Sequence, residues 1–240
     1  MNISGDTVIF WQYGPILLNA TIVFTWVIMG LLLLVVFLVN RSLAQGRKAS
    51  RRRHLLETLL AFLMLQIREV MGREPRGFLP FPATLFFFIA TANVLAVVPG
   101  FIPPTGSLST TTALALTVLV AVPFFGIRDS GIRAYCANYL RPTPLMLPFN
   151  IIGELSRTLA LAVRLFGNVM SGTMIAAILI VIAPMVLPVL AQLMGILLGL
   201  VQAYIFTILA TVYIGAGLQL TEGNAKNRNN EHREPRSRNL

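Results

Sequence analysis

Long apolar runs alternate along this chain with short segments rich in arginine and lysine. A bilayer crossing takes about 20 apolar residues, and five runs meet that need: residues 17–39, 78–98, 110–127, 148–183 and 185–218. The segment from His54 to Arg73 differs because Glu57, Arg68 and Glu69 interrupt its apolar pattern, which is typical of a helix at the membrane interface. The pattern therefore predicts an all-α polytopic membrane protein with about five transmembrane helices and one interfacial amphipathic helix.

The last two runs are longer than one crossing requires. Residues 148–183 would form a helix about 54 Å long, against a hydrocarbon core of about 30 Å. Both helices are therefore expected to tilt steeply or to project from the bilayer. Prolines from Pro184 to Pro188 break the pattern between them, so the two helices should form an antiparallel hairpin.

The positions of the basic residues predict the orientation. Of 19 Lys and Arg, only Arg157 and Arg164 lie inside a predicted span, and the others lie in segments on one side of the membrane. By the positive-inside rule that side is cytoplasmic, which places the N-terminus outside and the C-terminus inside. Residues 1–220 are expected to form a single membrane domain, without a cleaved leader, and residues 221–240 a disordered cytoplasmic tail.

Composition agrees with this class and excludes others. The chain is 56% hydrophobic and 12% charged, and its mean hydropathy is +0.76, values that rule out a water-soluble protein. A net charge of +10 could suggest nucleic acid, but the basic residues are placed as topology markers, so no nucleic-acid partner is expected. The basic segment 41–53 could also bind anionic membrane lipids.

The sequence predicts no cofactor or metal site. Cys136 is the only cysteine, and the two histidines, His54 and His232, lie outside the predicted spans. A phosphate-binding glycine loop and a zinc motif of the H-E-x-x-H type are both absent. The chain is therefore expected to be non-catalytic by itself.

One face of the fourth predicted helix carries most of its polar residues. Arg157, Arg164 and Ser171 fall at i, i+7 and i+14, and Asn168 lies one turn beyond Arg164, so at about 100° per residue they share a face. An arginine at the bilayer centre costs about 2.5 to 17 kcal/mol. Arg157 could extend to the headgroups, whereas Arg164 better fits a role in ion movement, with its counter-charge supplied by another subunit.

The last helix carries a polar residue of its own. Gln202 shares a face with Gly195 and Tyr213, and Gly195 and Gly199 form a GxxxG pair that permits close helix packing. Gln202 could bond to any neighbouring helix, or it could pair across the hairpin with Arg164.

Three blocks of sequence resemble a known family. They are SRTLALAVRLFGN (Ser156–Asn168), LVQAYIFTILATVYIG (Leu200–Gly215) and PTGSLSTTTALAL (Pro104–Leu116). In order and spacing they resemble the a subunit of rotary F-type ATP synthase, which is subunit 6 in mitochondria. The arginine block followed by MSG looks closest to an alternate bacterial branch, some members of which are thought to move sodium.

The resemblance implies a stator subunit of an ion-transporting two-sector ATPase in the bacterial plasma membrane. Its partners would be the c-subunit ring, the b-subunit stalk and other F-type ATPase subunits. Its tilted hairpin would hold two half-channels that pass protons to and from the ring carboxylates. Arg164 would be the essential cation, which lowers the pKa of each passing carboxylate. Asn168 and Gln202 match family positions that line the path.

Several positions depart from the family pattern. Many relatives carry titratable groups where this chain has Thr173 and Gly195, and an acid where it has Asn150. Three explanations stay open. Water fills the outer half-channel, or the transported ion is not a proton, or Glu154 and residues elsewhere replace the missing titratable groups. Supporting roles in the ion path are expected for Glu154, Arg157, Asn150, Ser171, Thr173 and Tyr213.

Three other functions stay open at this stage. The first is a sodium-translocating version of the same subunit. The second is a self-contained secondary transporter, which the lack of a convincing internal repeat disfavours. The third is a membrane scaffold without an ion path, in which Arg164 only pairs with an acidic residue of a partner.

Overall fold

A computed structural model describes residues 9–13, 16–44, 51–72, 77–98, 101–132, 146–182 and 187–231. In this part of the chain the structure has six α-helices and one short β-hairpin. The predicted all-α polytopic fold is confirmed: four helices are long and apolar enough to cross a membrane, and a shorter apolar helix accompanies them. The predictions for Cys136, His232 and residues 232–240 lie outside the described residues.

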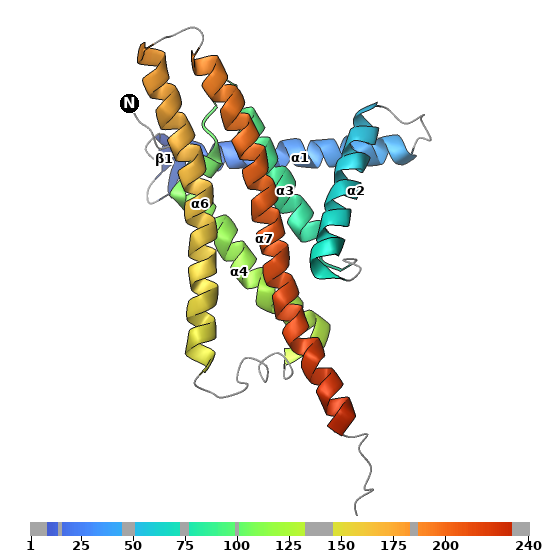
Figure 1. The fold of residues 1–240 in the computed structure, drawn as a ribbon. Coiled ribbons are helices and arrows are strands. Elements are labelled where there is room, and N and C mark those ends of the chain that lie inside the picture. The colour runs from blue at the N-terminus through green and yellow to red at the C-terminus, as the bar shows by residue number, and fades with distance from the viewer. Residues whose placement is uncertain are drawn as a thin grey trace, which may run out of the picture.

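The two longest helices, α6 (Met146–Ile182) and α7 (Leu187–Glu231), lie side by side and antiparallel (Figure 1). Each has a proline near its start, Pro148 in α6 and Pro188 in α7, where a missing N–H breaks no helical hydrogen bond. Neither helix has a proline farther along. Both helices are longer than the roughly 30 Å hydrocarbon core.

Helix α7 ends later than the sequence suggests. It continues to Glu231, past the boundary at residue 220 where a disordered tail was expected. The segment has no proline before Pro235, and each residue added to an existing helix forms one more backbone hydrogen bond. The helical part of the chain is therefore longer than the apolar part.

A shorter pair of helices lies behind this hairpin. Helix α3 (Pro80–Leu95) is connected to α4 (Leu108–Ser130) by a segment that includes the one-turn 3₁₀ helix η2 (Pro104–Gly106). Turns on both sides limit α3 to 16 residues, about 24 Å, which is less than the predicted span 78–98.

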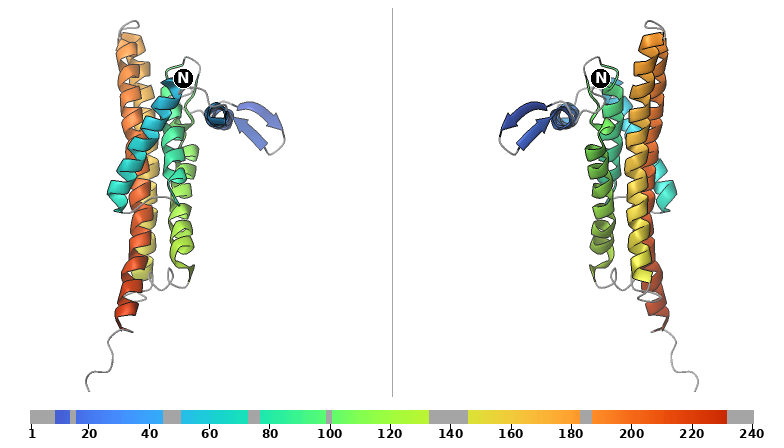
Figure 2. Two further views of the ribbon diagram at one scale, coloured as in Figure 1. Left: turned by 90° about the vertical axis from the view of Figure 1, so that its right-hand side faces the viewer. Right: turned by 90° about the vertical axis from the view of Figure 1, so that its left-hand side faces the viewer.

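Helix α1 (Ala20–Ala44) runs crosswise to α6 and α7, beyond the α3–α4 layer (Figures 1 and 2). Strands β1 (Ile9–Tyr13) and β2 (Ile16–Asn19) precede it as an antiparallel hairpin. The sequence analysis did not predict this hairpin, although β1 is rich in aromatic residues that favour strands. Because β2 pairs with β1, the helix begins at Ala20 rather than at residue 17.

Helix α2 (Arg51–Met71) has the expected amphipathic character. Leu63, Ile67 and Met71 recur every four residues and are buried, whereas Arg68 and Glu69 are exposed. The side chain of Gln66 accepts a hydrogen bond of 2.7 Å from the Tyr204 hydroxyl of α7. These contacts place α2 against α7.

The core lies where α3, α4, α6 and α7 meet. Small residues allow the close packing there, as in other membrane helix bundles. Its buried members include Leu85, Phe88, Ile89, Ala92, Ala115, Val118, Leu161, Ala162, Leu165, Ala203, Phe206 and Ala210. The buried hydroxyls of Thr207 and Thr211 donate to carbonyls of their own helix one turn earlier, so they need no partner on another helix.

Candidate functional site

Arg164 is an exposed cation on the polar face of α6 that also carries Arg157, Asn168 and Ser171. On the adjoining apolar face, Leu159 and Val163 are 64% and 53% exposed. Among the residues that the structure describes, Arg164 has no hydrogen bond and no ion pair. In a membrane an apolar face of this kind contacts lipid or another protein, so the guanidinium is available to an outside partner.

Arg157 lies two turns earlier on α6 and has a partner on the next helix. Its guanidinium carbon is 5.7 Å from the ring centre of Tyr213 on α7, within the range of a cation–π interaction. Arg157 itself is exposed, and Asn150 and Glu154 on the same helix are half-buried. The two arginines of α6 therefore differ: Arg157 has a ring partner on α7, whereas Arg164 has no such partner among the described residues.

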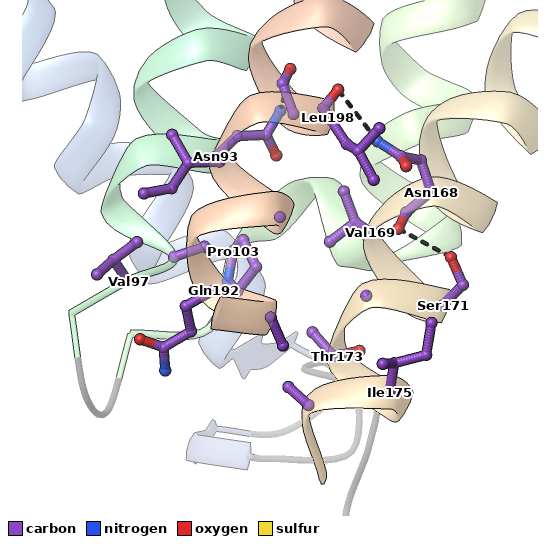
Figure 3. Close-up of a pocket in the computed structure, with 17 residues that line it drawn as sticks. Asn93, Val97, Pro103, Asn168, Val169, Ser171, Thr173, Ile175, Gln192 and Leu198 are labelled. Carbon is purple, nitrogen blue, oxygen red and sulfur yellow. Dashed lines mark hydrogen bonds between the residues drawn. The ribbon is translucent and has the colours of Figure 1, made fainter. Parts of the chain in front are cut away.

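The remaining predicted residues of α6 follow Arg164 towards the end of the hairpin. The Asn168 amide approaches the Leu198 carbonyl of α7 at 3.5 Å, a long contact. The hydroxyls of Ser171 and Thr173 donate to the carbonyls of Asn168 and Met170 in their own helix, at 3.1 and 2.9 Å. Figure 3 shows Asn168, Ser171 and Thr173 along one stretch of α6.

Gln202 is buried rather than paired with Arg164. Its side chain is 6% exposed, and within the described residues its Nε2 atom has no hydrogen-bond partner. The polar pair across the hairpin that the sequence analysis considered is therefore not formed, because Gln202 packs inside the bundle and Arg164 remains outside it. A buried amide donor without a hydrogen bond costs about 1–3 kcal/mol. Gln202 therefore destabilises the isolated chain unless water or another subunit supplies an acceptor.

A cavity of about 200 Å³ lies between α3, α6 and α7. Its polar lining consists of amides and hydroxyls: Asn93, Asn168, Ser171, Thr173 and Gln192. Thr173 and Gly195, where many relatives were expected to carry titratable groups, both line it. None of the described lining residues is ionisable. The cavity is therefore uncharged and mainly apolar, with these five polar side chains in its lining.

The sequence analysis did not single out Asn93. Its Nδ2 atom donates to the Gly199 carbonyl at 3.0 Å, and its Oδ1 atom accepts from Thr105 at 3.2 Å. A signal was present, because Asn93 is the one amide in the uncharged run 78–98, and a buried amide is unfavourable there unless it is hydrogen-bonded.

Fold and site together define a polytopic α-helical membrane protein whose long hairpin carries an exposed arginine without an ionic partner in the described residues, Arg164, near an uncharged cavity. The family model described as ATP synthase A chain matches residues 22–215. The chain belongs to this family, which confirms the resemblance found in the sequence. Its partners are accordingly other subunits of an F-type ATPase.

Several curated relatives are similar over most of their length. ATP synthase subunit a of Nitrosospira multiformis is 54% identical over 95% of this chain and 89% of its own length. ATP synthase subunit a of Albidiferax ferrireducens is 56% identical, over 90% and 94% respectively. ATP synthase subunit a 1 of Chlorobaculum parvum is also 56% identical, over 92% and 98%.

Proposed function

We propose that this chain is the stator ion-channel subunit of a rotary F-type ATP synthase. In this role it passes protons through two half-channels to and from the carboxylates of the c-subunit ring. The observation that carries the proposal is Arg164, an exposed guanidinium in an otherwise apolar membrane helix that has no ionic partner in the described part of the chain. A carboxylate from a neighbouring subunit would offset the cost of placing this charge in the membrane.

Arg164 acts on the ring carboxylate as a fixed charge. A cation within about 4–6 Å favours the ionised form of a carboxyl group, so a carboxylate that reaches Arg164 loses its ion. Once it moves away into an apolar environment, the neutral form is favoured again and a new ion binds. The same positive charge keeps ions from passing directly between the two half-channels.

The cavity between α3, α6 and α7 fits the outer half-channel. Asn168 lines the cavity and lies one helical turn from Arg164, so an ion in the cavity is close to the fixed charge. Asn150, Glu154, Arg157 and Tyr213 lie along the hairpin in the other direction from Arg164. We assign the inner half-channel to that end, with Gln202 beside the region where the two paths approach each other.

The proposal includes the predicted topology. The N-terminus is outside, the C-terminus is cytoplasmic, and residues 1–220 form one membrane domain in a bacterial plasma membrane. If α1 follows the bilayer normal, its crosswise arrangement (Figure 1) tilts α6 and α7 steeply in the membrane. The exposed face of α6 then follows the c-ring, and the b-subunit stalk and lipids contact other surfaces.

ATP-driven ion uptake into vesicles that carry the whole complex tests this function. Arg164→Ala should abolish uptake while the soluble sector still hydrolyses ATP. Arg157→Ala is the comparison: it removes the other exposed arginine of the same helix, whose proposed role is only a supporting one, and should leave most uptake intact. If Arg164→Ala retains coupled uptake, the ion-path role fails and a scaffold becomes the better account.

A sodium-translocating version is the second candidate. It is favoured by the cavity lining, in which the described residues offer amide and hydroxyl groups but no titratable relay. Such groups can pass a hydrated cation. The same uptake assay decides between the ions: a strict sodium requirement supports this version, and unchanged uptake without sodium supports protons.

A further inference from the structure

We propose that Asn93 is a positioning residue for ion transfer, which holds α7 in the place that the hairpin needs. Asn93 forms its hydrogen bonds with Gly199 and Thr105, and not with Arg164 or Gln202. It acts through Gly199, and so sets the spacing of α6 and α7 beside the cavity. This inference rests on the proposed function of the hairpin.

The orientation of the Asn93 amide follows from its partners. The Gly199 carbonyl can only accept a hydrogen bond, so the Nδ2 atom must face it, at 3.0 Å. The Oδ1 atom then faces the Thr105 hydroxyl at 3.2 Å. Asn93 is 5% exposed and Thr105 is fully buried. Thr105 thus holds the amide in the one orientation that bonds to α7.

Close packing makes this contact possible. A Cβ atom at position 199 would lie 2.7 Å from Cβ and 2.9 Å from Cγ of Asn93, distances that real side chains do not tolerate. Only glycine leaves the helix carbonyl within reach of Asn93. At Gly195, one turn earlier, an added Cβ atom would meet no described heavy atom within 4 Å.

The same region also contacts α6. Gly106, next to Thr105 in η2, lies so close to α6 that an added Cβ atom would be 3.3 Å from Val169. The neighbouring Asn168 reaches the Leu198 carbonyl of α7. Asn93 and Asn168 therefore approach α7 from opposite sides (Figure 3) at two consecutive carbonyls, those of Gly199 and Leu198.

A shift of α7 at Gly199 would also displace the residues that we assign to the ion path. Asn168 lies one turn from Arg164, and Gln202 lies one turn from Leu198. Loss of the Asn93 bond would leave the long contact from Asn168 as the only hydrogen bond to the carbonyls of Leu198 and Gly199 from another described helix. Misplacement of an interacting group by about 1 Å can reduce a rate by about 100-fold, so a small displacement is enough to impair coupling.

The test measures ions transported per ATP hydrolysed, for each assembled complex in vesicles. Asn93→Leu keeps the branched shape of the side chain without the amide and should lower this ratio about 10- to 100-fold. Thr105→Val removes only the hydroxyl that orients Asn93 and should lower the ratio less. Thr105→Ser keeps a hydroxyl at this position and should therefore keep the ratio of the unmodified complex.

Thr207→Val is the matched control. Thr207 is also fully buried, but its hydroxyl donates to Ala203 within its own helix, so the ratio should not change. The inference is overturned if Asn93→Leu and Thr105→Val reduce only the amount of complex and leave the ratio intact. If Asn93→Leu does not assemble, the contrast between Thr105→Val, Thr105→Ser and Thr207→Val decides the question. Retained coupling in Arg164→Ala would instead refute the proposed function.

Discussion

Two polar residues of the hairpin, Arg164 and Gln202, lie in opposite environments. Arg164 is exposed and has no partner in the described part of the chain, whereas Gln202 is buried with an unbonded Nε2 atom. Both are unfavourable for the isolated chain, Arg164 as a charge in the membrane and Gln202 as an unsatisfied donor. Both costs are offset if a ring carboxylate pairs with Arg164 and a water molecule or another subunit accepts a hydrogen bond from Gln202.

Gln202→Leu separates function from stability. Because Nε2 lacks a partner within the described residues, leucine should leave the thermal stability of the detergent-solubilised complex unchanged or raise it by about 1 kcal/mol. ATP-driven ion uptake should fall if Gln202 belongs to the ion path. A clear loss of stability would show that the amide is already bonded in the complex, contrary to this account.

Sequence periodicity can group residues that lie on a single helix. Periodicity alone places Asn168 and Ser171 on one stretch of α6, and both line the cavity. It could not find the bond from Asn93 to Gly199, because these residues are 106 positions apart and no local pattern connects them. It also could not decide whether Gln202 faces Arg164, since the rotation of α7 depends on packing against α3 and α4.

At the scale of helices, the GxxxG pair of α7 has two unequal members. Gly199 packs against Asn93 of α3, and Gly195 lines the cavity with open space around it. The contact at Gly199 is therefore with α3, and not with the partner helix of the hairpin.

Gly199→Ala and Gly195→Ala form a matched pair of substitutions that tests this packing. Alanine at 199 would place Cβ 2.7 Å from Asn93 Cβ and should destabilise the subunit by about 1–3 kcal/mol through overpacking. Alanine at 195 should have almost no effect on stability. Thermal unfolding of the purified complex measures both, and equal effects at the two positions would contradict the packing described.

At the scale of the whole molecule, helices were predicted better than their arrangement. Each apolar run from residue 78 onward became a helix because a membrane segment must satisfy its backbone hydrogen bonds internally. The crosswise direction of α1 and the β-hairpin before it (Figure 2) could not be predicted. They depend on which faces pack together, and the hydropathy of α1 is similar all around.

Labelling of single cysteines tests the orientation of the chain. In a Cys136→Ser background, Ser109→Cys should react with an impermeant maleimide added outside intact cells, since Ser109 is exposed and lies in the first turn of α4, on the predicted outer side. Gln45→Cys, in the basic segment after α1, should react only after permeabilisation. The reverse labelling pattern would overturn the positive-inside assignment.

The central claim is that the positive charge at position 164 couples ion flow to the ring. The most direct measurement is ATP synthesis driven by an imposed ion gradient, in vesicles carrying the whole complex with Arg164→Gln or with Arg157→Gln. The account predicts a loss of about 100-fold or more for Arg164→Gln. For Arg157→Gln, which removes a supporting group of the assigned inner half-channel and its cation–π contact with Tyr213, it predicts a much smaller loss of synthesis. Substantial synthesis by an assembled Arg164→Gln complex would contradict it.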